Sequence, residues 1–262
     1  MLNRIEEFHT VEGVSLEVVR LRPEEYSSNP PIVMLHEGLG SVAMWKDFPE
    51  RLAASTATEV IAYSRAGYGR SGPAKLPRTV RYMHDEGLKV LPRLIDLLEM
   101  EKPILFGHSD GGSIALICAG GTETALSGLV IMAPHIFVEQ ITVDSIAQAK
   151  EVWQTTDLPD RLGRFHDDAE AAFIGWNDIW LHSDFFHWNI EEYLSAIQVP
   201  VLAIQGQNDE YGSMVQIDGI ARVIPNTLLL KLPNCRHSPH KDQPEAVLAA
   251  CNQFIDSQMV CK

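Results

Sequence analysis

The 262-residue chain has few cysteines and no long apolar run. Its four cysteines, Cys118, Cys235, Cys251 and Cys261, include no Cys-x-x-Cys pair. Scattered thiols favour neither a disulfide framework nor a zinc site, so we expect a reducing compartment. Nowhere do about 18 uncharged apolar residues run together, and the first residues lack the apolar centre of a signal peptide. We therefore expect a cytoplasmic protein with no membrane partner.

Basic residues are also scarce. The chain has 21 Lys and Arg against 35 Asp and Glu, a formal charge of −14. Nucleic acids and anionic membranes attract clustered Lys and Arg, so this balance argues against both as partners. We expect a small-molecule substrate, and the composition leaves a homo-oligomer open. The length allows one domain with a large core and an insertion.

Short apolar runs alternate with helical patterns along most of the chain. The runs predicted as strands cover residues 14–21, 32–35, 59–63, 103–106, 128–133, 199–206 and 227–232. Apolar spacing of three and four predicts helices over 44–52 and 88–98, the second with a kink at Pro92. Continuous apolar strands separated by helices predict an α/β fold with a mostly parallel sheet covered on both faces.

Residues 135–196 differ from this pattern. They contain helical patterns and no convincing strand, together with four of the five tryptophans. We interpret this segment as a helical cap inserted into a core formed by residues 1–134 and 197–262. Trp180 and Trp188 are candidates for lining a substrate pocket under the cap. The cap histidines, His166, His182 and His187, have no metal-binding spacing, so packing or surface roles are favoured.

A serine lies between a buried strand and a helix rich in small residues. In Gly107-His108-Ser109-Asp110-Gly111 it has a glycine two residues away on each side. A tight strand-to-helix turn requires such glycines because a Cβ there would clash. The segment is therefore a candidate nucleophile elbow, with Ser109 as the nucleophile. The side chain of His108 is expected to turn away from the crevice and pack.

A serine nucleophile needs a base and a group that orients the base. In open α/β sheets the crevice lies beyond the carboxyl ends of the strands, where two later strands are followed by Asp209 and His237. We predict that His237 is the base and Asp209 its orienter. Glu210 and His240 are the alternative acid and base. We expect no cofactor and no metal.

These motifs together resemble the α/β-hydrolase fold superfamily along nearly the whole chain. The resemblance rests on the loop His36 to Ser41, the stretch Arg65 to Ser71, the elbow, and the Asp209 and His237 loops. It implies an α/β-hydrolase fold with Ser109, Asp209 and His237 as a catalytic triad. It also implies an oxyanion hole built from the amide of Asp110 and an amide of the His36 loop.

The His36 loop departs from the family pattern His-Gly-x-Gly because Glu37 is inserted after His36. Alignment on the glycines makes Leu39 the second oxyanion donor, which we prefer, and alignment on His36 makes it Gly38. Glu37 either points into the site as a second carboxylate or caps local backbone amides.

The resemblance implies a serine hydrolase that cleaves a small carboxylic ester or lactone through an acyl-enzyme. Within the superfamily, the chain has a narrower and weaker resemblance to carboxylesterases and enol-lactonases. A carbon–carbon bond hydrolase or a cofactor-free haloperoxidase would use the same three residues. A non-catalytic ligand receptor with the hydrolase fold is the alternative from another class.

Overall fold

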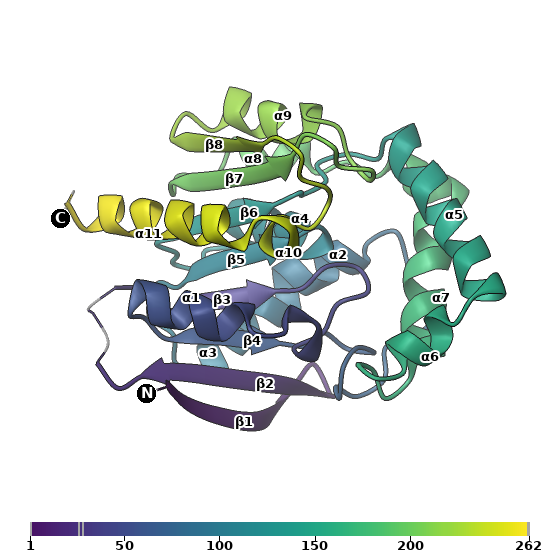
Figure 1. Ribbon diagram of the computed structural model, residues 1–262, viewed down its shortest axis with the longest axis horizontal. Coiled ribbons are helices and arrows are strands. Elements are labelled where there is room, and N and C mark those ends of the chain that lie inside the picture. The colour runs from purple at the N-terminus through teal and green to yellow at the C-terminus, as the bar shows by residue number, and fades with distance from the viewer. Residues whose placement is uncertain (1, 26, 28, 261–262) are drawn as a thin grey trace.

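The computed structural model describes residues 2–25, 27 and 29–260, and among them eight strands form one sheet (Figure 1). The spatial order is β1-β2-β4-β3-β5-β6-β7-β8. β1 and β2 pair antiparallel, as do β2 and β4, and all other neighbours are parallel. The strands are β1 (Leu2–Val11), β2 (Val14–Pro23), β3 (Ile32–Leu35), β4 (Val60–Tyr63), β5 (Ile104–His108), β6 (Gly128–Met132), β7 (Val201–Gly206) and β8 (Thr227–Leu232).

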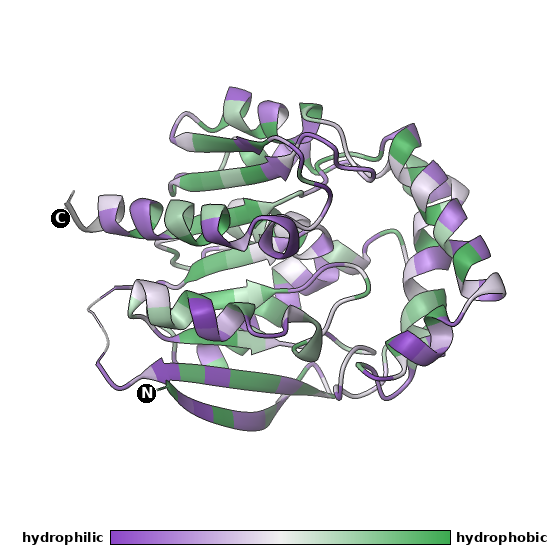
Figure 2. Ribbon diagram, viewed as in Figure 1, coloured by the Kyte–Doolittle hydropathy of each residue, from purple (hydrophilic) through white to green (hydrophobic). Residues whose placement is uncertain are grey.

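Helices cover both faces of the sheet, which confirms the predicted α/β fold class. Every residue of β3, β4, β5 and β6 is buried, as parallel strands between two helical layers require, and these strands are mainly hydrophobic in Figure 2. The helices are η1 (Ala43–Trp45), α1 (Phe48–Thr56), α2 (Tyr82–Asp85), η2 (Glu86–Val90), α3 (Leu91–Leu97), α4 (Asp110–Gly121), α5 (Gln140–Thr155), α6 (Leu158–Leu162), α7 (Ala169–Trp180), η3 (Ser183–His187), α8 (Glu191–Leu194), α9 (Val215–Val223), α10 (Pro239–Asp242) and α11 (Pro244–Val260).

Alternate residues of the central strands β3 to β7 contribute to two separate cores. One core joins Leu105 of β5 to Ile114 and Ile117 of α4. The other joins Phe106, the next residue of β5, to α1 and to Phe254 of α11. Successive strand side chains point to opposite faces, so a single strand such as β5 holds helices on both sides. β5 is therefore the central support for the serine that follows it.

The sequence patterns missed β1. This strand is mostly exposed or half-buried along its length, so it lacks a continuous apolar run. It forms a hairpin with β2 through Glu12 and Gly13, which both have positive φ, 49° and 80°. Two successive residues with positive φ make a tight hairpin turn whose twist matches that of the strands. In the sequence, the Glu-Gly pair before Val14 was the feature that could have indicated this hairpin.

The helix predicted over 88–98 is interrupted before Pro92. The turn Glu86–Val90 is a π-helix, and α3 begins directly after it at Leu91. Proline has no N–H to donate to the preceding turn and its ring crowds that turn, so a wider turn at this place relieves both problems. The kink expected at Pro92 is therefore a π turn on its N-terminal side.

All helices from α5 to α8 lie between β6 and β7 in the chain. α5, α6 and α7 stand apart from the sheet in Figure 1. α8 instead packs closely against α4. A Cβ on Gly120 of α4 would lie only 2.1 Å from the carbonyl oxygen of Tyr193 of α8. The boundaries of the predicted cap, 135–196, stay a prediction.

Cys261 lies outside the described residues. None of the described helices combines the length and the apolar character needed to cross a bilayer.

The close approach of α8 to α4 predicts a strong effect of Gly120→Ala. The new methyl group would meet backbone, which cannot rotate away, so we expect a loss of about 1–3 kcal/mol in the free energy of unfolding. Urea unfolding measures this loss. The matched control is Gly163→Ala, where the nearest atom to a new Cβ is 3.4 Å away. Equal stability of the two variants would contradict the prediction.

Candidate active site

Ser109 sits in a sharp turn between β5 and α4. Its backbone has φ 53° and ψ −118°, a conformation that non-glycine residues rarely adopt. A Cβ on Gly107 would lie 2.3 Å from the carbonyl oxygen of Gly111, and a Cβ on Gly111 would lie 2.1 Å from that of Leu35. The tight turn therefore needs glycine at both positions, as the sequence predicted, and it projects the hydroxyl at the start of α4.

The residues predicted as base and orienter meet this serine. His237 follows β8 and Asp209 follows β7, so both lie at the same edge of the sheet as Ser109. The Nε2 atom of His237 is 3.0 Å from the Ser109 Oγ, and its Nδ1 atom is 2.8 Å from Oδ1 of Asp209. Both distances are those of hydrogen bonds. The three side chains form one continuous chain from carboxylate to hydroxyl.

Burial and pairing shift the pKa values of His237 and Asp209 in opposite directions. Burial alone would lower the pKa of His237, but the charge of Asp209 and its hydrogen bond raise the pKa above its ordinary value. Burial alone would raise the pKa of Asp209, but the His237 ring and the amide of Tyr211 lower it. The pair therefore favours an ionised carboxylate, which can stabilise an imidazolium.

Asp209 is fixed by further hydrogen bonds. Its Oδ1 atom accepts from the amides of Tyr211, at 2.8 Å, and Gly212, at 3.3 Å, and Gln205 Nε2 donates to Oδ2 at 3.2 Å. The same Gln205 amide group also donates to the carbonyl of Gly212. The carboxylate is thus held by its own loop and by the end of β7, which sets its orientation toward His237.

A cavity of about 120 Å³ lies beside Ser109. Its wall is mainly apolar and combines the triad edge of the sheet with helices α5 and α7. The lining residues are Glu37, Gly38, Leu39, Ser109, Asp110, His135, Thr142, Ile146, Trp176, Trp180, Tyr211 and His237. The predicted pocket residues Glu37 and Trp180 are among them. Trp188, the other candidate, is not among them; it stacks on Phe185, next to Trp180.

The two loops predicted to supply oxyanion donors lie side by side. Gly38, Leu39 and Asp110 all line the cavity with Ser109. Which amide of the first loop completes an oxyanion hole stays a prediction. A Cβ on Gly38 would lie 2.2 Å from Nε1 of Trp176, so the first loop must have glycine there for α7 to pack against it.

A buried arginine holds these two loops together. Arg65 Nη2 donates to the carbonyl of Glu37 at 2.8 Å, and its Nη1 lies 3.6 Å from the Asp110 carboxylate. Tyr82 donates to the same carboxylate at 2.7 Å. In the sequence this arginine is recognisable only as part of the stretch Arg65 to Ser71, and Tyr82 has no recognisable signal because its partner is 28 residues away. The side chain of Asp110 is therefore structural in this arrangement.

The alternative residues lie elsewhere. Glu210 pairs with Arg236 at 2.7 Å and accepts from the amide of His237, not from its ring. His240 is buried among aromatic rings, and its two ring nitrogens have no hydrogen-bond partner among the described residues. His108 is fully buried and turned away from the cavity, as expected. The structure therefore brings Asp209 and His237, and neither alternative, to the serine.

Among the cap histidines, His166 has a defined structural position. It accepts from the amide of Gly69 at 2.9 Å through Nδ1 and donates to the carbonyl of Leu39 at 3.0 Å through Nε2. It thus connects the cap segment to two loops of the sheet. His182 and His187 line no part of the cavity. No group of three or more His, Cys, Asp and Glu side chains in the described part of the chain could hold a metal ion.

His135, Trp176 and Tyr211 line the cavity but were missed by the sequence analysis. Burial lowers the pKa of His135 to about 4, so its ring is neutral at physiological pH. Its position directly after the end of β6 was the available signal, since strand ends point into the crevice.

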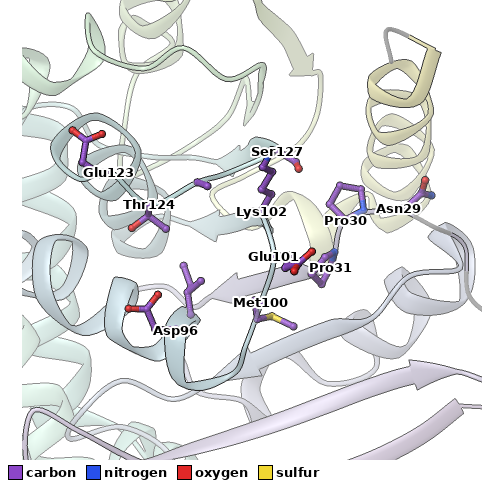
Figure 3. Close-up of a pocket in the computed structure, with 12 residues that line it drawn as sticks. Asn29, Pro30, Pro31, Asp96, Met100, Glu101, Lys102, Glu123, Thr124 and Ser127 are labelled. Atoms are coloured by element: carbon purple, nitrogen blue, oxygen red, sulfur yellow. The ribbon is translucent and has the colours of Figure 1, made fainter.

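A larger hollow of about 820 Å³ lies at the other edge of the sheet (Figure 3). Pro31, Lys102 and Ser127, which line it, precede β3, β5 and β6, whereas the triad residues follow their strands. The hollow is therefore separated from Ser109 by the length of the sheet, and its size does not make it the site of this chemistry.

A mostly parallel sheet with serine, histidine and aspartate converging beyond its carboxyl ends defines the α/β-hydrolase class of enzyme. A model of the alpha/beta hydrolase family matches residues 32–250, and the chain belongs to this family of hydrolases.

Known relatives agree with this assignment. A putative carbamate hydrolase, RutD, of Pseudomonas savastanoi is 28% identical over 256 residues, covering 88% of this chain and 96% of the relative. A crystal structure from a study of carboxylesterases of the thaumarchaeon Nitrososphaera gargenis has a TM-score of 0.79 at 19% identity, covering 98% of this chain and all of that one. The enol-lactonase of Burkholderia xenovorans has a TM-score of 0.74 at 19% identity, covering 95% and 100%. At these identities the two structures establish the shared fold alone.

The raised pKa of His237 gives a prediction that does not depend on a substrate. In Asp209→Asn the negative charge is lost, so we expect the His237 pKa to fall below its wild-type value. NMR titration of the histidine ring protons measures it, with His237→Gln used to assign the signal. A His237 pKa that is equal in wild type and Asp209→Asn would show that the two side chains are not coupled.

Proposed function

We propose that this enzyme is a serine hydrolase that cleaves a small carboxylic ester or lactone through an acyl-enzyme intermediate. The observation that carries the proposal is the hydrogen-bonded chain from Asp209 through His237 to Ser109, with distances of 2.8 and 3.0 Å. A serine hydroxyl is a weak nucleophile at neutral pH, and this chain supplies both a base and a group that orients the base.

In the proposed reaction, Ser109 Oγ attacks the carbonyl carbon while His237 Nε2 takes its proton. The negative oxygen of the tetrahedral intermediate is stabilised by backbone amides, those of Asp110 and of Leu39 or Gly38. His237 then donates its proton to the leaving alcohol or enolate, and the acyl group stays on Ser109. A water molecule, deprotonated by His237, attacks the acyl-enzyme, and breakdown of the second tetrahedral intermediate releases the acid and restores Ser109.

The cavity favours a small and mainly apolar acyl group. Ligand pockets are commonly about 300–1,000 Å³, whereas this cavity has about 120 Å³ and is lined by Trp176, Trp180 and Ile146. Esters and lactones suit it better than peptides, which need room on both sides of the scissile bond. The similar proteins described above, a carboxylesterase, an enol-lactonase and a putative carbamate hydrolase, have names that belong to the same broad chemistry.

Labelling with a fluorophosphonate probe tests the proposed nucleophile. We expect wild-type protein to be labelled stoichiometrically and Ser109→Ala to lose the label, because the probe reacts with an activated serine hydroxyl. Ser55→Ala is the matched control, since Ser55 lies on α1 and bonds only its own helix. No labelling of folded wild type would favour the ligand receptor, and labelling of Ser109→Ala would place the nucleophile elsewhere.

Trp180 is predicted to limit the length of the acyl group. It lines the cavity and also a separate hollow of about 420 Å³ next to Val143 and Phe186. Removing its indole in Trp180→Ala joins the two spaces. Since each methylene bound in an apolar site contributes roughly tenfold or more in kcat/KM, the octanoate-to-acetate ratio for p-nitrophenyl esters should rise at least about tenfold.

Trp153→Ala is the control for this experiment. Trp153 is also a cap tryptophan, stacked on Phe173, but it does not line the cavity. Its acyl-length profile should match that of wild type. An unchanged octanoate-to-acetate ratio in a folded Trp180→Ala protein would show that Trp180 does not close the acyl site. Lactones of the aromatic-pathway type, with their hydrolysis followed by the acid formed, separate a lactonase from an open-chain esterase.

A further inference from the structure

Two residues that the proposed mechanism does not use, His108 and Glu37, form a buried contact behind the catalytic histidine. His108 is the last residue of β5 and precedes Ser109. Its ring is fully buried, and its Nε2 atom is 2.7 Å from the backbone carbonyl oxygen of His237. A carbonyl oxygen can only accept a hydrogen bond, so Nε2 carries a proton and donates it.

The other ring nitrogen of His108 faces the inserted glutamate. Nδ1 lies 3.5 Å from Oε2 of Glu37, and it has no hydrogen-bond partner among the described residues. The ring of His108 therefore lies between the Glu37 carboxylate on one side and the carbonyl of His237 on the other.

Glu37 itself is kept ionised by its surroundings. Lys241 Nζ lies 3.5 Å from Oε1, on the other carboxylate oxygen from His108. Burial opposes ionisation, but Lys241 and His108 hold the pKa of Glu37 well below its ordinary value. No backbone amide donates to this carboxylate in the hydrogen bonds of the described residues, so it does not cap the local backbone. Glu37 therefore lies beside the cavity as a carboxylate, between Lys241 and the ring of His108.

The remaining ionisable neighbours of His108 are histidines. The ring of His240 is 4.9 Å away and that of His237 is 5.2 Å away. Burial and the nearby His108 lower the pKa of His240 well below its ordinary value, so it is neutral and does not compete for Glu37. Glu37 is therefore connected through His108 to the main chain of His237.

We propose that His108 is a positioning residue, oriented by Glu37, that fixes the backbone of His237 relative to Ser109. This inference rests on the proposed function. Asp209 sets the rotation of the His237 ring, and the hydrogen bond from His108 sets the place of its backbone. Because His108 and Ser109 are adjacent in the chain, the nucleophile and its base are tied to the same strand end. A small displacement of a reacting group can cost about 100-fold in rate, so this tie bears on acylation.

The test compares two substitutions of His108. His108→Phe keeps the ring shape and removes the donor, whereas His108→Gln places an amide N–H near the position of Nε2. We expect His108→Phe to lower the rate of fluorophosphonate labelling and the kcat for p-nitrophenyl acetate about 10- to 100-fold, with KM nearly unchanged. His108→Gln should recover most of this loss. Glu37→Gln should lower turnover several-fold with thermal stability near wild type.

His240→Phe is the matched control, because His240 is an equally buried neighbour with no hydrogen bond to the triad. It should label at close to the wild-type rate. Thermal unfolding of each variant confirms that it is folded. Wild-type labelling by folded His108→Phe, or equal losses in His108→Phe and His108→Gln, would overturn the proposal, and a wild-type rate in Glu37→Gln would remove Glu37 from it. Absence of labelling in wild type would instead overturn the proposed function.

Discussion

The backbone turn at Ser109 is the constraint on which the site depends. A left-handed residue between β5 and α4 is strained, and it persists because the surrounding backbone leaves no other path. The strand before the turn is held by parallel neighbours on both sides, and α4 packs on the same sheet. The hydroxyl therefore stands at one fixed point, and every other group of the site is placed relative to it.

Charges around that point are buried in compensating pairs. Asp209 faces His237, and Arg65 faces Asp110 between two loops that flank the cavity, whereas Glu37 pairs with the more exposed Lys241. Leaving one charge of such a pair unmatched in a low-dielectric interior costs several kcal/mol, so the pairs specify how the loops meet. The site is thus rigid through its electrostatics as well as through packing.

The central strands agree with the prediction from the sequence for local reasons, and His237 lies within hydrogen-bond distance of both Ser109 and Asp209, while the catalytic roles of these three residues stay a proposal. Continuous apolar runs identify buried strands, and glycines at 107 and 111 identify a turn whatever surrounds it. β1 was missed because an exposed edge strand buries too little apolar surface to leave a pattern. The sequence does not show which of Trp180 and Trp188 lines the cavity, because that depends on whether each ring faces the cavity or another aromatic ring.

Sequence alone determined the fold class, the nucleophile turn and the pair of strand ends from which an acid and a base would come. These features depend on periodicity, on glycine sterics and on the rule that parallel strands end at one edge. The tertiary structure decided which polar groups at that edge touch. In the structure Glu210 pairs with Arg236, His240 is buried among aromatic rings, and Glu37 contacts His108. The sequence does not reveal such contacts, because they link residues far apart in the chain and depend on where whole loops pack.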